Sequence, residues 1–149
     1  MNIVESAGLK LLRLLNPEFA HNVAIKALSL GLTPKPKTRV FENLKTSVGG
    51  LELDSPIGLA AGFDKNAEAV DPLLKCGFGF VEVGAVTPEG QPGNPKPRLF
   101  RLPKDKAVIN RFGFNNLGMD IVSARLAKRS EKGIVGVNLG ANKDSDDRI

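Results

Sequence analysis

The sequence predicts an α/β fold in which two amphipathic helices precede a parallel β-sheet. Apolar residues recur at helical spacing over residues 2–15 and 17–31. Further along, short apolar runs alternate with helical segments, an order typical of a parallel sheet. The 149 residues are 42% hydrophobic and 25% charged, which is the balance of one folded domain. This composition excludes a disordered, collagen-like or disulfide-rich chain.

The first predicted unit is a helical hairpin over residues 1–33, followed by a Pro- and Lys-rich linker over 34–45. Asn16 is placed to cap the second helix, with Pro17 at its first position and Gly31 at its end. The apolar sides are formed by Ile3, Val4, Ala7, Leu11, Leu12, Leu14 and Leu15, and then by Phe19, Ala20, Val23, Ala24, Ala27 and Leu28. These sides either pack on the rest of the domain or lie in a membrane interface.

Positive charge is concentrated at the start of the chain. Residues 1–45 carry seven basic and three acidic residues, so they hold four of the five net positive charges. Such a stretch suits an anionic membrane surface or simple solubility. Nucleic acid is a poor partner because no aromatic residues interleave with the basic ones and no nucleic-acid-binding motif is present. No apolar run reaches the roughly 18–20 residues of a membrane span.

The second predicted unit, residues 46–149, holds the parallel sheet. Gly49-Gly50 indicates a hairpin turn between two short strands, and residues 88–103, with five prolines, indicate a long irregular loop. The predicted strands of the sheet are Ile57–Gly62, Phe80–Thr87 and Ile134–Gly140, and the predicted helices are Asn66–Lys75 and Ser123–Lys132. Cys76 is the single cysteine, so no internal disulfide forms, and we expect a packed, unreactive thiol.

Candidate binding residues follow the predicted strands, because ligands bind at the carboxyl ends of parallel strands. The segment Ala60–Lys65 combines small residues, which let a planar ligand approach, with a cation. Asn138 ends the last strand, and Asn110–Asn116 mixes amides, an arginine and two aromatic residues, which suits a small planar anion. A lysine after a strand is more often a solvated loop residue, which is the alternative for Lys65, and Asn138 can instead serve the loop backbone. His21, the only histidine, is as well explained by a helix surface, and no metal site is predicted.

These segments resemble class 2, quinone-dependent dihydroorotate dehydrogenases, and the resemblance spans essentially the whole chain. The matching segments are Pro17–His21, Ser55–Lys65, Gly77–Gly84, Pro92–Leu102, Asn110–Asn116 and Gly136–Gly140. The family fold is a (β/α)8 TIM-type barrel that carries FMN at its carboxyl face. The resemblance implies oxidation of dihydroorotate to orotate in pyrimidine (UMP) biosynthesis, with electrons passed to a membrane quinone. It also implies a peripheral location on the cytoplasmic face of the cell membrane, if the source is bacterial.

Residue roles carry over by motif. The flavin contacts implied are Ala61, Gly62, Phe63, Asp64, Lys65, Ala85 and Asn138. The substrate contacts implied are Lys65, Asn110, Arg111, Phe112, Gly113 and Phe114, and the quinone side is represented by His21 and Arg101. Ala85 departs from relatives that carry Ser or Thr, which removes one side-chain hydrogen bond to the flavin, worth about 1 kcal/mol.

The family's catalytic base, a serine in an Asn-x-Ser-Ser-Pro-Asn segment, has no match here and is expected beyond Ile149. The flavin phosphate site, built after strands 7 and 8 of such barrels, is also missing. We therefore expect the chain to be the N-terminal part of an unclosed barrel that is inactive alone. Two alternatives remain: a class 1 soluble enzyme that reduces fumarate or NAD, which the hairpin argues against, and a non-catalytic, membrane-associated half-barrel.

Overall fold

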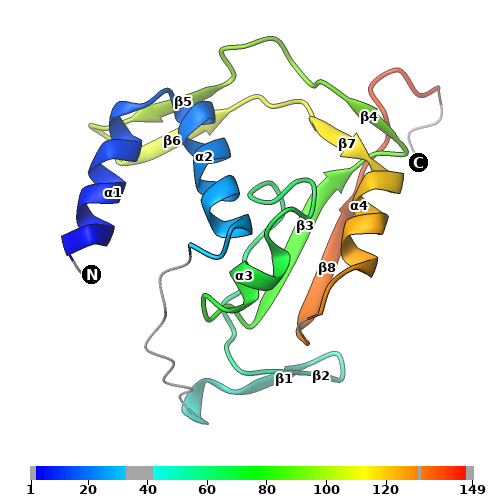
Figure 1. The fold of residues 1–149 in the computed structure, drawn as a ribbon. Coiled ribbons are helices and arrows are strands. Elements are labelled where there is room, and N and C mark those ends of the chain that lie inside the picture. Colours follow the sequence, from blue (N-terminus) through cyan, green and yellow to red (C-terminus); the bar gives the residue numbers. More distant parts are fainter. Residues whose placement is uncertain (1–2, 33–41, 131, 147–149) are drawn as a thin grey trace.

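The computed structural model describes residues 3–32, 42–130 and 132–146, and it mixes helices with strands as an α/β chain does (Figure 1). The elements in chain order are α1 (Ile3–Leu14), α2 (Pro17–Ser29), the 3-10 turn η1 (Glu42–Leu44), β1 (Thr46–Val48), β2 (Leu51–Leu53), α3 (Val70–Leu74), β3 (Phe80–Val86), β4 (Glu89–Gln91), β5 (Leu99–Leu102), β6 (Ala107–Asn110), β7 (Asn116–Gly118), α4 (Met119–Ala127) and β8 (Ile134–Leu139). The predicted class and element order therefore hold, while several boundaries differ.

The parallel sheet is built on β3. Strand β8 pairs with it in parallel from Phe80↔Ile134 to Val83↔Val137, with a register shift before the last pair. On its other side Leu59 bridges Val81 in parallel. The predicted strand Ile57–Gly62 is thus wrong as a regular strand, since only this bridge forms. One reason is that Gly62, at a φ of +102°, turns the chain away from the extended path.

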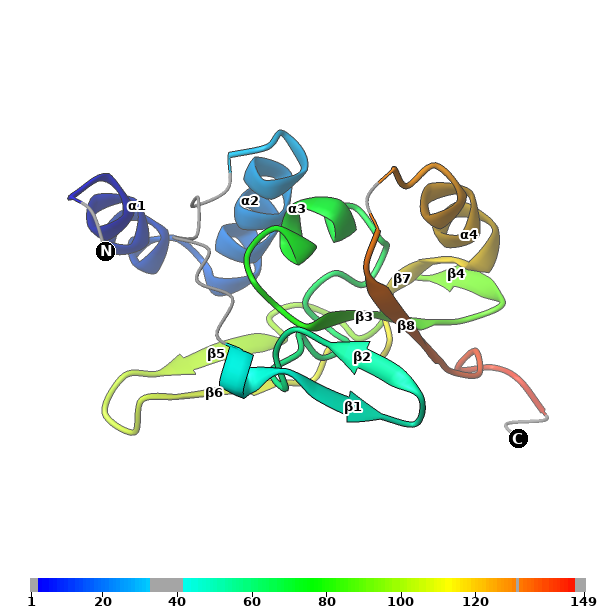
Figure 2. The same ribbon diagram turned by 90° about the horizontal axis from the view of Figure 1, so that it is seen from below.

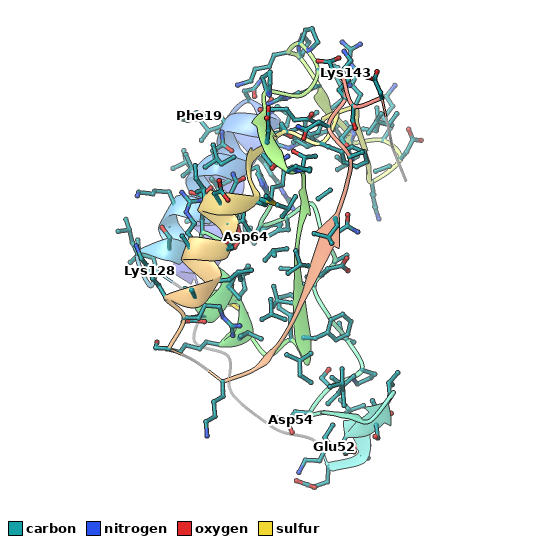
Figure 3. All side chains as sticks on the ribbon, turned by 90° about the vertical axis from the view of Figure 1, so that its right-hand side faces the viewer. Phe19, Glu52, Asp54, Asp64, Lys128 and Lys143 are labelled. Carbon is teal, nitrogen blue, oxygen red and sulfur yellow. The ribbon has the colours of Figure 1, made fainter. Side chains whose placement is uncertain are left out.

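The core lies between β3 and the helices that cover one of its faces (Figure 3). Val81 and Val83 are completely buried in the sheet. They pack with Val70 and Leu73 of α3 and with Val122 of α4, which are almost fully buried. The alternation of buried valines along β3 therefore sends the intervening residues, including Glu82, to the opposite face, where β1 and β2 lie near one end.

Both predicted helices of the second unit have wrong boundaries. Helix α3 begins at Val70 rather than Asn66, because Ala67 has a positive φ of +54° and the Asp64 carboxylate binds the backbone amides before the helix. Helix α4 begins at Met119, after Gly118 at a φ of +86°, and ends at Ala127 rather than Lys132.

The predicted irregular loop over residues 88–103 is also wrong in part. Residues 88–118 form an extended structure that we call the arm, in which β4 pairs antiparallel with β7 and β5 pairs antiparallel with β6. The strand partners lie beyond residue 103, so the proline-rich stretch gave no sign of them. Figure 1 shows the arm running from the ends of β3 and β8 to α1 and α2.

The N-terminal helices follow the prediction closely. The Asn16 side chain accepts hydrogen bonds from the amides of Glu18 and Phe19, at 3.1 and 3.3 Å, as an N-cap does. Gly31 follows the end of α2 at a φ of +78°. Residues 34–41 of the predicted linker lie outside the described residues, and its remainder includes η1. None of the helices in the described ranges has the length and apolarity needed to cross a membrane.

The predicted turn at Gly49-Gly50 is confirmed, because β1 and β2 pair antiparallel across it. Viewed from below, this hairpin lies across the starting end of β3 and β8 (Figure 2). In Figure 3, Glu52 and Asp54 accordingly lie at one end of the molecule and Lys143, after β8, at the other. The carboxyl ends of the parallel strands therefore face the arm, away from the hairpin.

Candidate active site

A pocket of about 550 Å³ lies where the carboxyl ends of the parallel strands meet the arm. We call it the strand-end pocket. Its size is in the ordinary range for a small-molecule site. The residues that line it are Ala61, Gly62, Lys65, Gly84, Ala85, Asn94, Asn110, Arg111, Phe112, Gly113, Phe114 and Asn138. The structure thus gathers ten of the residues that the sequence indicated for flavin or substrate, from three strand ends and the arm.

The lining from β3 and the loop before it carries almost no side chain. Gly84 and Ala85 come from β3, and Ala61 and Gly62 come from the neighbouring segment that bridges β3 at Leu59. A hydrogen bond from the Gly62 amide to the Gly84 carbonyl, at 2.8 Å, joins the two. A β-carbon at Gly62 would meet no atom within 4 Å, so the space beside it is open. A β-carbon at Gly84 would collide with the backbone oxygen of Asn138. Small residues here therefore keep room for a ligand and let β8 approach.

Lys65 brings the positive charge of this pocket. Its Nζ donates to the Gly62 carbonyl at 2.7 Å and lies 4.2 Å from the centre of the Phe112 ring, in a cation–π contact. Burial lowers the pKa of Lys65, the Glu18 carboxylate opposes this effect and Arg98 adds to it. Lys65 is therefore a half-buried pocket cation, and the solvated-loop interpretation is not supported.

The arm supplies the other wall, and Asn94 fixes its shape. Asn94 donates its backbone amide to the Phe112 carbonyl at 2.9 Å and its side-chain amide to the Arg111 carbonyl at 2.8 Å. The Arg111 guanidinium donates to the Pro97 carbonyl, at 3.0 Å from Nη2, so its charge is held on the arm. Sequence reasoning missed Asn94 as a site residue, although it lies in the quoted segment Pro92–Leu102.

Asn138 completes the pocket from β8. Its Nδ2 donates to a carboxylate oxygen of Glu82 on the neighbouring strand at 3.1 Å. That bond orients the side chain, while the residue lines the pocket. Both expectations for Asn138 are therefore compatible, because a structural hydrogen bond leaves its carboxamide oxygen available to a ligand.

Two of the residues indicated for the flavin, Phe63 and Asp64, do not line the strand-end pocket. Asp64 is 1% exposed, and its two carboxylate oxygens accept from the amides of Glu68 and Ala69, each at 2.8 Å. Phe63 packs edge-on against His21, with ring centres 5.1 Å apart. Asp64 thus shapes the loop that carries Lys65, and both residues face a second pocket.

This second pocket, which we call the α2 pocket, has a volume of about 310 Å³. It is lined by Glu18, His21, Asn22, Ile25, Phe63, Asp64, Lys65, Asn66, Glu68, Phe112, Asn115 and Leu117. Burial lowers the pKa of His21 and the charge of Lys65 lowers it further, while a hydrogen bond with the Phe63 backbone opposes them. Lys65 and Phe112 line both pockets, so they form the wall between them.

Arg101, the other residue indicated for the quinone side, lines neither pocket. Its guanidinium donates to the carbonyls of Leu12, Arg13 and Leu15, at 3.1, 3.0 and 2.8 Å. These are carbonyls at the carboxyl end of α1, which a cation stabilises. Arg101 therefore ties α1 to the arm. Among the described residues, no group of three His, Cys, Asp or Glu side chains is placed to hold a metal ion.

Comparisons with known proteins match these segments. The family model for dihydroorotate dehydrogenase matches residues 43–149. A protein of Cereibacter sphaeroides strain KD131, named dihydroorotate dehydrogenase (quinone), is 57% identical over 149 residues, which are 99% of this chain and 42% of that protein. A protein of the same name from Rhodopseudomonas palustris strain CGA009 is 58% identical over 146 residues, covering 97% of this chain and 40% of its own length.

A solved structure agrees as well. The crystal structure of DHODH from Eimeria tenella in complex with ferulenol has a TM-score of 0.83 and 48% identity, covering 89% of this chain and 38% of that chain. The chain therefore spans about two fifths of the length of the relatives it matches. The resemblance identified from the sequence is confirmed: the chain belongs to the dihydroorotate dehydrogenase family.

Proposed function

We propose that this chain supplies the first strands and the flavin and substrate walls of a quinone-dependent dihydroorotate dehydrogenase, which oxidises dihydroorotate to orotate for UMP biosynthesis. The observation that carries the proposal is the pair of pockets divided by Lys65 and Phe112. The strand-end pocket suits a flat ring together with a substrate that carries a carboxylate. The α2 pocket is lined in part by residues of the N-terminal helix α2. In the whole enzyme the parallel segments described above belong to a (β/α)8 barrel.

FMN fits the strand-end pocket by the chemistry of its lining. The small residues Ala61, Gly62 and Ala85 offer a flat surface, and the open space beside Gly62 admits a ring system. Lys65 supplies a cation and Asn138 supplies amide hydrogen bonds for a polar ring edge. When bound, FMN accepts a hydride from the substrate and passes electrons onward. Phe63 and Asp64 contribute indirectly, by shaping the loop that carries Lys65.

Dihydroorotate is the proposed substrate of the same pocket. The carboxylate of this pyrimidine matches the Lys65 ammonium, and the amides of Asn110 and of the Arg111–Phe114 backbone match its ring oxygens and nitrogens. Phe112 and Phe114 exclude water from the ring. None of the described serines lines the pocket, so the proton removed during oxidation needs a base from outside these residues. We accordingly expect the 149 residues alone to show no turnover.

A membrane quinone is the proposed electron acceptor, reached on the side of α1 and α2. Leu11 and Leu14 of α1 are 62% and 84% exposed, and Phe19 of α2, at the edge of the molecule in Figure 3, is 57% exposed. Exposed apolar side chains on helices that also carry Lys10, Arg13 and Lys26 suit an anionic lipid surface. We place the protein peripherally on the membrane, on the cytoplasmic face if the source is bacterial, with His21 on the quinone side.

The test uses the product of the intact gene. We expect a bound flavin whose absorbance bleaches when dihydroorotate is added without oxygen and returns when a quinone analogue is added in detergent. Reoxidation by fumarate or NAD instead of quinone would favour a class 1 activity. Lys65→Met should slow bleaching by on the order of 100-fold, since it removes a cation beside the reacting ring. Lys104→Met, on an exposed turn of the arm, is the control and should leave the rate unchanged.

The membrane part of the proposal is tested separately. The protein should sediment with phosphatidylglycerol vesicles and not with phosphatidylcholine vesicles at low salt. Leu11→Ser combined with Leu14→Ser should weaken sedimentation without changing flavin bleaching by dihydroorotate. If vesicle binding is absent while quinone turnover in detergent is normal, the location is wrong and the activity stands. Vesicle binding without flavin or turnover would instead favour the non-catalytic membrane-associated module.

A further inference from the structure

A buried ion pair joins α2 to the arm. Glu18 and Arg98 are 8% and 7% exposed, and the chain separates them by 80 residues. Arg98 Nη2 lies 2.7 Å from Glu18 Oε1, and Nε lies 3.2 Å from both carboxylate oxygens. Nη1 donates to the carbonyls of Pro92 and Asn94, at 2.6 and 3.0 Å. The guanidinium thus clamps the helix and two points of the arm at once.

Each end of this pair is connected to the wall between the two pockets. Glu18 lies one helical turn before His21, and both line the α2 pocket. Arg98 lies 5.4 Å from the centre of the Phe112 ring, against which Lys65 Nζ lies at 4.2 Å. Asn94, whose carbonyl Arg98 holds, donates its own amide to Phe112. Arg98 therefore contacts Phe112 directly, and through Phe112 the pair is connected to Lys65.

A stabilising role alone does not explain this arrangement. Burying two charges carries a desolvation cost that their attraction often only balances, so apolar residues would serve packing as well. The Glu18 and Arg98 charges also act on Lys65 in opposite senses: the carboxylate raises the pKa of Lys65 and the guanidinium lowers it. Glu18 lines the α2 pocket together with Lys65, and Arg98 and Lys65 contact the same Phe112 ring, so removing either partner leaves the other charge uncompensated in the surroundings of Lys65.

We infer that Glu18 and Arg98 form a positioning pair for Lys65, which holds Phe112 against its ammonium and keeps two opposite charges balanced beside it. The inference rests on the proposed function for its purpose, since Lys65 is the proposed partner of the flavin and of the substrate carboxylate. Other charged groups that line the two pockets with Lys65 are His21 on α2, Asp64 and Glu68 on its own loop, and Arg111 on the arm, while Lys96 lies 3.5 Å from Glu18. They stay unchanged in the variants below.

The experiment measures Lys65 directly, through the pH dependence of its acetylation by acetic anhydride, followed by peptide mass spectrometry of the intact gene product. Only the neutral amine reacts. Glu18→Gln should move the midpoint of the acetylation profile to lower pH, and Arg98→Met should move it to higher pH. Each shift should change the rate at a fixed pH by on the order of threefold or more. Arg98→Lys keeps the charge and should restore the midpoint.

Arg129→Met is the matched control, because it breaks a half-buried ion pair with Asp71, 2.9 Å apart, that lies outside both pockets. It should lower stability without moving the Lys65 midpoint. If both Glu18→Gln and Arg98→Met leave the midpoint in place, or move it in the same direction, the inference is wrong. If Arg98→Met fails to fold, Glu18→Gln and Arg98→Lys still decide it, because only the first should shift the midpoint.

A second measurement separates this inference from the proposed function. In the parent protein, dihydroorotate-dependent flavin bleaching tests the proposed function without reference to the pair. If the parent bleaches and Glu18→Gln and Arg98→Met shift the alkaline limb of the bleaching rate in opposite directions, both hold. If the parent does not bleach, the proposed function fails, and the acetylation midpoints still accept or reject the pair as positioning Lys65.

Discussion

Replacing Asp64 should destabilise the protein because its buried carboxylate holds the loop that carries Lys65. The two carboxylate oxygens accept from two backbone amides, each at 2.8 Å, and the side chain is 1% exposed. A hydrogen bond to a charged group contributes about 1.5 kcal/mol, so Asp64→Ala should cost about 3 kcal/mol. Asp64→Asn keeps one acceptor and one of the two bonds, and it should cost about half of that.

Thermal unfolding followed by circular dichroism of the intact gene product measures both variants. At roughly 2–4 °C per kcal/mol, Asp64→Ala should lower Tm by about 6–12 °C and Asp64→Asn by about 3–6 °C. Asp105→Ala, in an exposed turn of the arm, is the control and should shift Tm by less than about 2 °C. An unchanged Tm for Asp64→Ala, or equal losses for the two Asp64 variants, would refute the reasoning.

Three further outcomes follow from the geometry. Asn16→Ala removes the N-cap of α2 and should cost about 1 kcal/mol, seen as a lower Tm, whereas Asn16→Ser should not. Folding lowers the pKa of His21, so the unfolded chain takes up the imidazole proton before the folded chain does as the pH falls. The free energy of unfolding should therefore decrease as the pH drops below 6.5, and His21→Gln should flatten that slope. Gly62→Ala should lower Tm, because alanine is strained at a φ of +102°, and it should also weaken flavin retention, because the added β-carbon enters open pocket space.

The candidate site was predictable to the extent that topology alone assembles it. Parallel strands place their carboxyl ends at one edge of a sheet, so Ala61, Lys65, Ala85 and Asn138 had to come together once their strands were recognised. The likeness of Asn110–Phe114 to a family motif added the arm side of the pocket. The strand predicted over Phe80–Thr87 is likewise confirmed, as β3 (Phe80–Val86).

What could not be predicted depends on side chains that bind backbone at a distance. The start of α3 is set by the Asp64 carboxylate and by the positive φ of Ala67, which no helix pattern encodes. Phe63 and Asp64 precede Lys65 directly in the sequence, yet they line only the α2 pocket, whereas Lys65 lines both pockets. The ion pair of Glu18 and Arg98 links two segments 80 residues apart, and the sequence of neither segment indicates the other as its partner.

The arm arginines explain how the N-terminal helices keep a fixed relation to the site. Arg101 binds the carbonyls that end α1, Arg98 binds a carboxylate on α2, and Arg111 binds the arm itself through the Pro97 carbonyl. Each of these guanidinium groups binds a carboxylate or a carbonyl, whereas Lys65, from the loop before α3, brings its ammonium to the lining of the strand-end pocket. Under the proposed function, a helix pair resting on lipid would therefore be attached to the flavin wall through charged contacts. The position of the quinone side and the position of the flavin side would then depend on the same contacts. Replacing Arg98 should therefore disturb both.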